Sequence, residues 1–243
     1  MHQHIVTSFS DELDQLSAAL LQMGGLAETM ISDACQALTT QNRELAERVI
    51  SRNFEMDKME SDCQRDVTRL LALRQPMASD LRMVVGAIKI AGSIERIGHL
   101  SKNIAQRSIH IMDSGNMSAE TKNAMSINGI ERMGRAVSRQ LQIALDGYAR
   151  RDSEAALRVI FQDDDIDSHY NALLKSMLVY MTEDRQRLDE RSNFLFIVKN
   201  LERIGDHCSN IAKVVHFIAT GNHILNQNIP DQPTEGNDKA AKA

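Results

Sequence analysis

The stretch ERIGHLSKNIAQ at residues 95–106 returns as ERIGDHCSNIAK at residues 202–213, with 7 of 12 positions identical. A second match, at an offset of 110 residues, aligns LAERVI at 45–50 with AALRVI at 155–160 and keeps four of six positions. Unrelated segments of ordinary composition would share about one position in twelve. The sequence therefore predicts an internal duplication.

Each half of the duplication contains three long segments with the apolar spacing of amphipathic helices, separated by short polar breaks. Pro76 marks one break, because proline disfavours helical geometry in the residue before it, and Gly221 follows the last helix. Neighbours joined by short loops must run antiparallel. We therefore expect an all-α fold of two tandem three-helix bundles, residues 8–113 and 118–221. The expected helices cover residues 8–38, 43–74, 78–112, 118–150, 153–184 and 189–220.

Composition agrees with a helical globular protein. The 243 residues are 42% hydrophobic, 25% charged and only 4% aromatic, and Pro76 is the only proline before residue 230. The net charge of −5 argues against direct binding of nucleic acid, which favours basic surfaces. Residues 1–7 and 226–243 are expected to form a flexible N-terminus and a disordered tail.

The cysteines and the hydropathy pattern bear on the compartment. Cys35, Cys63 and Cys208 are odd in number and form no Cys-x-x-Cys pair, so we interpret them as reduced thiols in the core. The sequence shows no secretion signal and no uninterrupted apolar span of membrane length. By exclusion, we expect a cytoplasmic protein.

Two acidic pairs in the second half are candidate metal ligands. Asp163 and Asp167 lie four residues apart, as do Glu202 and Asp206, so each pair shares one helix face. If the helical hairpin brings the pairs together, four carboxylates converge and need a cation. The alternative without a metal is that each acidic pair forms part of a solvent-exposed helix face. Oxygen ligands favour a divalent or trivalent ion such as iron, manganese or magnesium, with zinc a further option and the identity open.

The equivalent positions in the first half are Asn53, Asp57, Glu95 and His99. Neutral Asn53 and the imidazole of His99 replace two acids, so this cluster could hold a different ion, fewer ions or none. Arg96 and Arg203 directly follow the glutamates and are weaker candidates for binding an anion such as phosphate, the alternative being that they are ordinary exposed arginines. No phosphate-cradling glycine loop, nucleophile elbow or Cys-His dyad is found in the sequence.

Duplicated three-helix units with Glu-Arg-Ile-Gly-Asp at 202–206 and Arg-Gln-Pro-Met-Ala-Ser-Asp-Leu-Arg at 74–82 resemble the PhoU family of phosphate-uptake regulators. The resemblance implies a cytoplasmic, usually homodimeric protein with no established catalysis of its own. It also implies an adaptor between the ATPase subunit of a phosphate ABC transporter and a sensor histidine kinase, recruited through them to the inner face of the membrane. Such an adaptor acts as a negative regulator of the phosphate-starvation response.

The resemblance also implies bound metal, often multinuclear iron, at Asp163 with Asp167 and at Glu202 with Asp206. A different class of function remains open at this stage, a carboxylate-bridged metalloenzyme built on helices. Such enzymes usually add Glu-x-x-His on facing helices, and neither Glu95 nor Glu202 has a histidine three residues on. A third possibility is a purely structural bundle without an ion.

Overall fold

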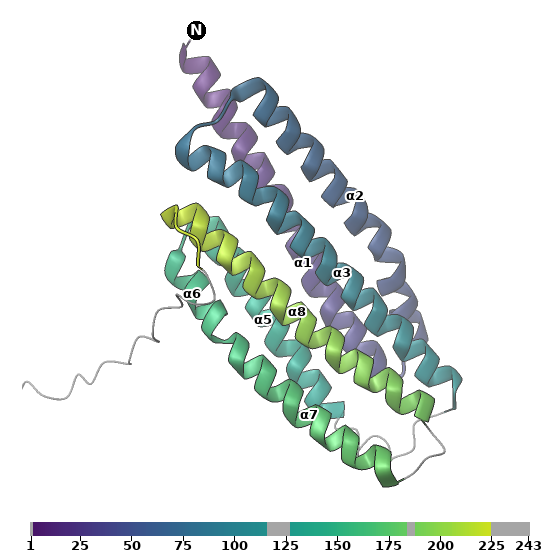
Figure 1. Cartoon of the computed structure of the whole chain (residues 1–243). Coiled ribbons are helices and arrows are strands. Elements are labelled where there is room, and N and C mark those ends of the chain that lie inside the picture. The colour runs from purple at the N-terminus through teal and green to yellow at the C-terminus, as the bar shows by residue number, and fades with distance from the viewer. Residues whose placement is uncertain (1, 116–126, 184–187, 225–243) are drawn as a thin grey trace, which may run out of the picture.

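The computed structural model describes residues 2–115, 127–183 and 188–224, and this part of the chain is helical apart from short turns. Two three-helix bundles lie side by side, one formed by the first half of the chain and one by the second (Figure 1). No helix in these ranges combines the length and apolarity needed to cross a bilayer. The helices are α1 (His2–Thr40), α2 (Arg43–Arg74), α3 (Ala78–Asp113), α5 (Ile127–Arg150), α6 (Ser153–Phe161), α7 (Asp163–Glu183) and α8 (Leu188–Thr220).

Equivalent polar residues begin the second helical segment of each repeat. The Asn42 side chain accepts a hydrogen bond from the Leu45 backbone N–H at 3.0 Å. Asp152, at the same place in the second repeat, accepts from the N–H groups of Glu154 and Ala155 at 2.9 and 3.0 Å. These bonds satisfy amides that have no partner within the helix, so the chain starts α2 and α6 at matching positions.

Two helix boundaries differ from the expectation. The first helix begins at His2 instead of residue 8, and the helix expected over 153–184 is interrupted at Gln162 between α6 and α7. Asp163 to Asp165 fall in the first turn of α7, where the exposed amides of a helix start favour negative charge. Apolar periodicity runs through this break and cannot reveal it. Residues 118–126 of the helix expected over 118–150, and the tail expected at 226–243, lie outside the described residues.

Close contacts at equivalent glycines relate the two repeats. A Cβ added at Gly24 of α1 would collide with Leu145 of α5, and one added at Gly134 of α5 would lie 2.6 Å from the Sγ of Cys35 on α1. In the duplication, Gly24 is equivalent to Gly134 and Cys35 is equivalent to Leu145. The two contacts are therefore the same contact, made once from each repeat. The repeats therefore face each other across an approximate twofold axis, with α1 antiparallel to α5.

The same exchange occurs where α3 packs on α8. Gly86 approaches Val214, whereas Arg107 donates a hydrogen bond to Asn193 at 2.8 Å, and the offset of 107 exchanges these pairs. In Figure 1, α3 and α8 lie in the middle of the molecule, and α2 and α7 lie on its outer sides. One continuous apolar core therefore runs through both repeats, with α2 and α7 covering its two flanks.

Gly98 and Gly205 bring the outer helices close to the central pair. A Cβ at Gly98 would lie 2.9 Å from the Cγ of Met56 on α2, and one at Gly205 would lie 3.2 Å from Ile166 on α7. Met56 and Ile166 are equivalent by the offset of 110. A glycine at the same place in both copies of the motif therefore lets α2 and α7 approach α3 and α8 closely, beside the candidate metal ligands.

The three cysteines are free and buried in the helical interior, as the sequence predicts. Burial raises the pKa of the Cys35 thiol to about 12 and that of Cys63 to about 11, and it also raises the pKa of Cys208. Because the reactive form of cysteine is the thiolate, these side chains act as small apolar packing groups.

Candidate metal centre

The first repeat brings Asp57, Glu95 and His99 together on the face between α2 and α3. The Nε2 atom of His99 lies 3.6 Å from Asp57 Oδ1 and 3.6 Å from Glu95 Oε1. One potential ligand atom from each residue lies within 4.8 Å of the others. Two donors to one ion at about 2.1 Å can be at most about 4.2 Å apart, so small side-chain rotations would complete the set.

Asn53 orients this cluster from one turn earlier on α2. Its Nδ2 donates a hydrogen bond to Asp57 Oδ2 at 2.9 Å, which leaves Oδ1 of Asp57 to face His99. Asn53 is 5% exposed, and its own Oδ1 is buried without a hydrogen-bond partner. An unpaired buried acceptor costs about 1–3 kcal/mol, and a cation or a water would satisfy it. Asp57, Glu95 and His99 therefore fit a cation, and Asn53 orients Asp57 beside them.

The second repeat gathers acidic side chains at the equivalent place between α7 and α8. Burial, together with the negative charges of Asp206 and Asp167, raises the pKa of Asp163 to about 6, although Ser209 and Lys213 oppose the rise. Burial also raises the pKa of Asp206, and Glu202 and Asp167 add to it. The charges of Asp163, Asp167 and Asp206 thus influence one another, and Glu202 acts on Asp206, but among the described residues these four acids do not form a group as compact as the trio of the first repeat.

A lysine already supplies positive charge to this second cluster. The Nζ of Lys199 lies 2.7 and 2.6 Å from the two carboxylate oxygens of Glu202, which is 13% exposed. Among the residues the structure describes, the tight three-residue grouping is the one in the first repeat, and the second repeat has no equally compact trio. Lys199 was not predicted as part of this cluster, although its spacing of three from Glu202 is the sequence signal for such a pair.

The two arginines that follow the glutamates approach the same imidazole from different repeats. Burial first, then the charges of Arg203 and Arg96, lower the pKa of His207. Arg96 lies 3.5 Å from Glu95 Oε2, and its side chain is 64% exposed. Residues 107 positions apart in the sequence therefore place positive charge together on the face shared by α3 and α8.

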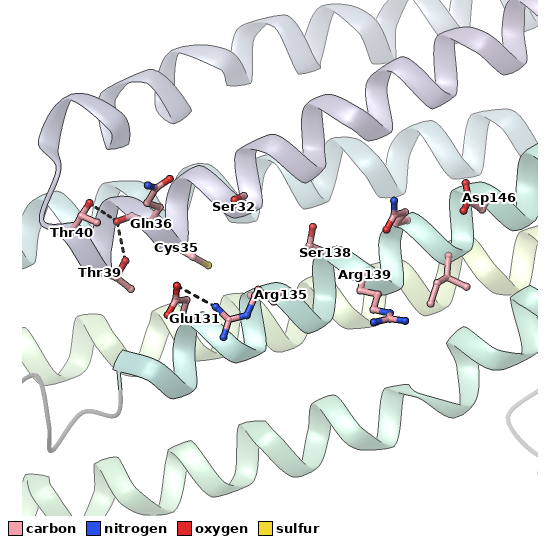
Figure 2. Close-up of a pocket in the computed structure, with 13 residues that line it drawn as sticks. Ser32, Cys35, Gln36, Thr39, Thr40, Glu131, Arg135, Ser138, Arg139 and Asp146 are labelled. Atoms are coloured by element: carbon pink, nitrogen blue, oxygen red, sulfur yellow. Dashed lines mark hydrogen bonds and ion pairs between the residues drawn. The ribbon is translucent and has the colours of Figure 1, made fainter.

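A separate groove of about 710 Å³ lies between α1 and α5 (Figure 2). Cys35 and Gly134 line it, and Glu131 pairs with Arg135 at 3.2 Å on its edge. The lining carries charges of both signs and includes no member of either acidic cluster. This groove therefore contributes nothing to the candidate metal centres.

The family model for the PhoU domain matches residues 20–108 and 130–215. The chain belongs to the PhoU family. The two matched segments coincide with the two repeats, which confirms the tandem arrangement and the resemblance inferred from the motifs.

A "phosphate-specific transport system accessory protein PhoU homolog" of Caulobacter vibrioides is 40% identical over 227 residues, which cover 93% of this chain and 96% of that protein. A protein of the same name from Rhizobium meliloti is 40% identical over 90% of each chain. The crystal structure of PhoU from Pseudomonas aeruginosa, 34% identical, matches with a TM-score of 0.81 over 88% of this chain and all of that one. A PhoU structure from Streptococcus pneumoniae, 25% identical, matches at 0.79 over 89% and 99%.

Proposed function

We propose that this PhoU-family chain is an accessory protein of a phosphate-specific transport system and a negative regulator of phosphate uptake and of the phosphate-starvation response. The observation that carries the proposal is the match to accessory proteins of that name over 93% of the chain, through both repeats. In this role it is an adaptor between the ATPase subunit of a phosphate ABC transporter and a sensor histidine kinase. It works at the inner face of the membrane, as a homodimer and without direct contact to nucleic acid.

The end of the molecule at the α2–α3 turn supports a role in binding other proteins. Leu73, Met77 and Leu81 are 66%, 80% and 41% exposed, although all three are large and apolar. Gln75 and Ala78 flank the exposed methionine with φ values of 47°, a left-handed conformation that is strained for side chains other than glycine. Neighbouring exposed apolar side chains on a strained turn are typical of a contact surface.

The proposal includes metal ions on both hairpins, bound by Asp57, Glu95, His99 and Asn53 in the first repeat and by Asp163, Asp167, Glu202 and Asp206 in the second. An ion at these clusters would neutralise repelling carboxylates and hold α2 to α3 and α7 to α8. The imidazole of His99 favours iron or zinc in the first repeat, whereas the all-oxygen set of the second repeat suits manganese or magnesium. The ion therefore acts as a clamp that stiffens the adaptor.

The regulatory part is tested by deleting the gene and measuring alkaline phosphatase during growth in high phosphate. We expect expression to rise in the deletion strain and to fall again when the intact gene is restored. Co-purification of the kinase and of the transporter ATPase with the tagged chain tests the adaptor. Continued repression in the deletion strain would contradict the proposed function.

The metal part is tested by elemental analysis after purification without chelators. His99→Ala should lower the metal content per chain, because it removes the group that joins Asp57 to Glu95. His110→Ala is the matched control, since it removes an exposed histidine from the same helix. Glu202→Ala with Asp206→Ala tests the second repeat in the same way. If neither variant changes the metal content, the clusters are not metal centres.

A further inference from the structure

A groove of about 510 Å³ lies between α3 and α8, apart from the acidic clusters. Its polar side chains all contain hydrogen-bond donors, and none is a carboxylate. These polar side chains include Lys89, Ser93 and Arg96 of α3 and His207 and Asn210 of α8. A lining that has lysine and arginine side chains, further hydrogen-bond donors and no carboxylate favours an anion over a cation.

The charge pattern of α3 reinforces this reading. The chain as a whole carries a net charge of −5, yet residues 81–112 contain five lysines and arginines and a single acid, Glu95. Glu95 turns toward Asp57 and His99 at the candidate metal centre and is not part of the groove lining. Two of these five basic residues, Lys89 and Arg96, line the groove, whereas the acid Glu95 faces α2.

The opposite end of the groove is apolar and aromatic. Phe217 and His223 stack with ring centroids 4.1 Å apart, and Val85, Val214 and Ile224 complete this end. A volume of about 510 Å³ is many times that of one phosphate group and lies within the usual range for drug-sized ligands. The ligand that suits both ends has a phosphate group and a flat or apolar organic part.

We propose that the α3–α8 groove binds a phosphorylated organic molecule of nucleotide size. Its phosphate lies at Lys89, Ser93 and Arg96, where charge-assisted hydrogen bonds hold it, and its organic part lies against Phe217. The site shares no residue with the metal centres, although Arg96 lies 3.5 Å from Glu95 Oε2, and it does not depend on the regulatory role proposed above. It gives the chain a small-molecule ligand of its own.

Gly92 offers a matched pair of variants for the test. It lines the groove, and a Cβ built on it meets nothing within 4 Å. Gly92→Glu and Gly92→Gln add side chains of nearly equal size and differ only in charge, and both replace a helical glycine by a better helix former. Lys89→Gln removes one positive group of the site, and Lys175→Gln, on exposed α7 surface, removes one charge elsewhere.

The affinities are measured by calorimetric titration of the full chain with AMP, ATP and inorganic phosphate. Each titration is repeated with EDTA to exclude binding through a metal ion. We expect AMP or ATP to bind with saturation. Gly92→Glu should weaken binding at least tenfold more than Gly92→Gln, Lys89→Gln should weaken it about tenfold, and Lys175→Gln should leave it unchanged. Absence of saturable nucleotide binding, or equal affinities for the two Gly92 variants, would overturn the proposal. Inorganic phosphate binding as tightly as AMP would show that the apolar end takes no part and would refute the organic ligand.

Discussion

Replacing Asp163 with asparagine should stabilise the metal-free protein at neutral pH and change its stability little in acid. In the folded state the pKa of Asp163 is raised to about 6 from an ordinary 3.8, first by burial and then by the charges of Asp206 and Asp167. The folded protein therefore keeps this proton to a higher pH than the unfolded chain does. Stability consequently falls as the pH rises from about 4 to about 6 and stays lower above that range. Asparagine carries no charge, so the variant does not lose this stability as the pH rises.

The size of the effect follows from the two pKa values. A rise from 3.8 to about 6 corresponds to about 3 kcal/mol at 1.36 kcal/mol per pH unit. Because Asp163 is only half-buried, solvent screens part of this free energy, and about 1–2 kcal/mol is the realistic gain for Asp163→Asn at pH 7.5. With a urea dependence of about 3 kcal/mol per molar, the unfolding midpoint should rise by about 0.3–0.7 M.

The change in stability is measured by urea unfolding at pH 4.5 and pH 7.5 with a chelator present. Far-ultraviolet circular dichroism follows the unfolding. Asp164→Asn is the matched control, because it removes the same charge from an exposed position in the same helical turn and should change stability by less than about 0.5 kcal/mol. Manganese or magnesium in place of the chelator should stabilise the wild type at pH 7.5 more than it stabilises Asp163→Asn. Identical midpoints for wild type and Asp163→Asn at pH 7.5 would refute the reasoning, as would a less stable variant.

Four further substitutions test the packing of two helical glycines and the two helix starts. Gly134→Ala should destabilise the protein by about 0.5–2 kcal/mol in thermal or urea unfolding, because its Cβ would lie 2.6 Å from the Cys35 sulfur and the gain in helix propensity offsets only part of the crowding. Gly25→Ala, with open space around the new Cβ, should instead stabilise by about 0.5–1 kcal/mol, and equal effects at both sites would contradict the packing argument. Asn42→Ala should cost about 1 kcal/mol at every pH tested. Asp152→Ala should also lower the stability at neutral pH, and this effect should disappear as acid protonates the wild-type carboxylate. Backbone hydrogen bonds from the residues that Asp152 caps lower its pKa. A loss of stability that does not depend on pH would argue against this cap.

Much of the fold could be predicted because the duplicated segments carry the same local signals twice. Asn42 and Asp152 are polar helix starts visible in the sequence, and the short breaks leave antiparallel hairpins as the workable arrangement. The interruption at Gln162 could not be predicted, because apolar spacing continues through it and three aspartates in a row have no single structural meaning. How the two repeats pack depends on contacts between distant residues such as Gly134 and Cys35, which periodicity does not report.

The candidate site was predictable to the extent that it follows from spacing within one hairpin. The offsets alone identify Asp57, Glu95 and His99 as the first-repeat equivalents of acids in the second repeat. The structure brings these three residues together. The sequence suggested that the all-acid second repeat was the stronger cluster, but there Lys199 already neutralises Glu202. The groove near Lys89 was missed because its two walls come from different repeats, and nothing local in the sequence says that α3 faces α8.

The exchanged contacts of Gly24 with Leu145 and of Gly134 with Cys35 carry a historical consequence. A protein with one repeat could bury the same surfaces by pairing with a second copy of itself, and joining two copies in one polypeptide makes that partnership permanent. Once fused, the copies no longer need identical residues. His99 stands where the second repeat has Asp206, a difference that such freedom permits and that gives the two equivalent clusters different chemistry.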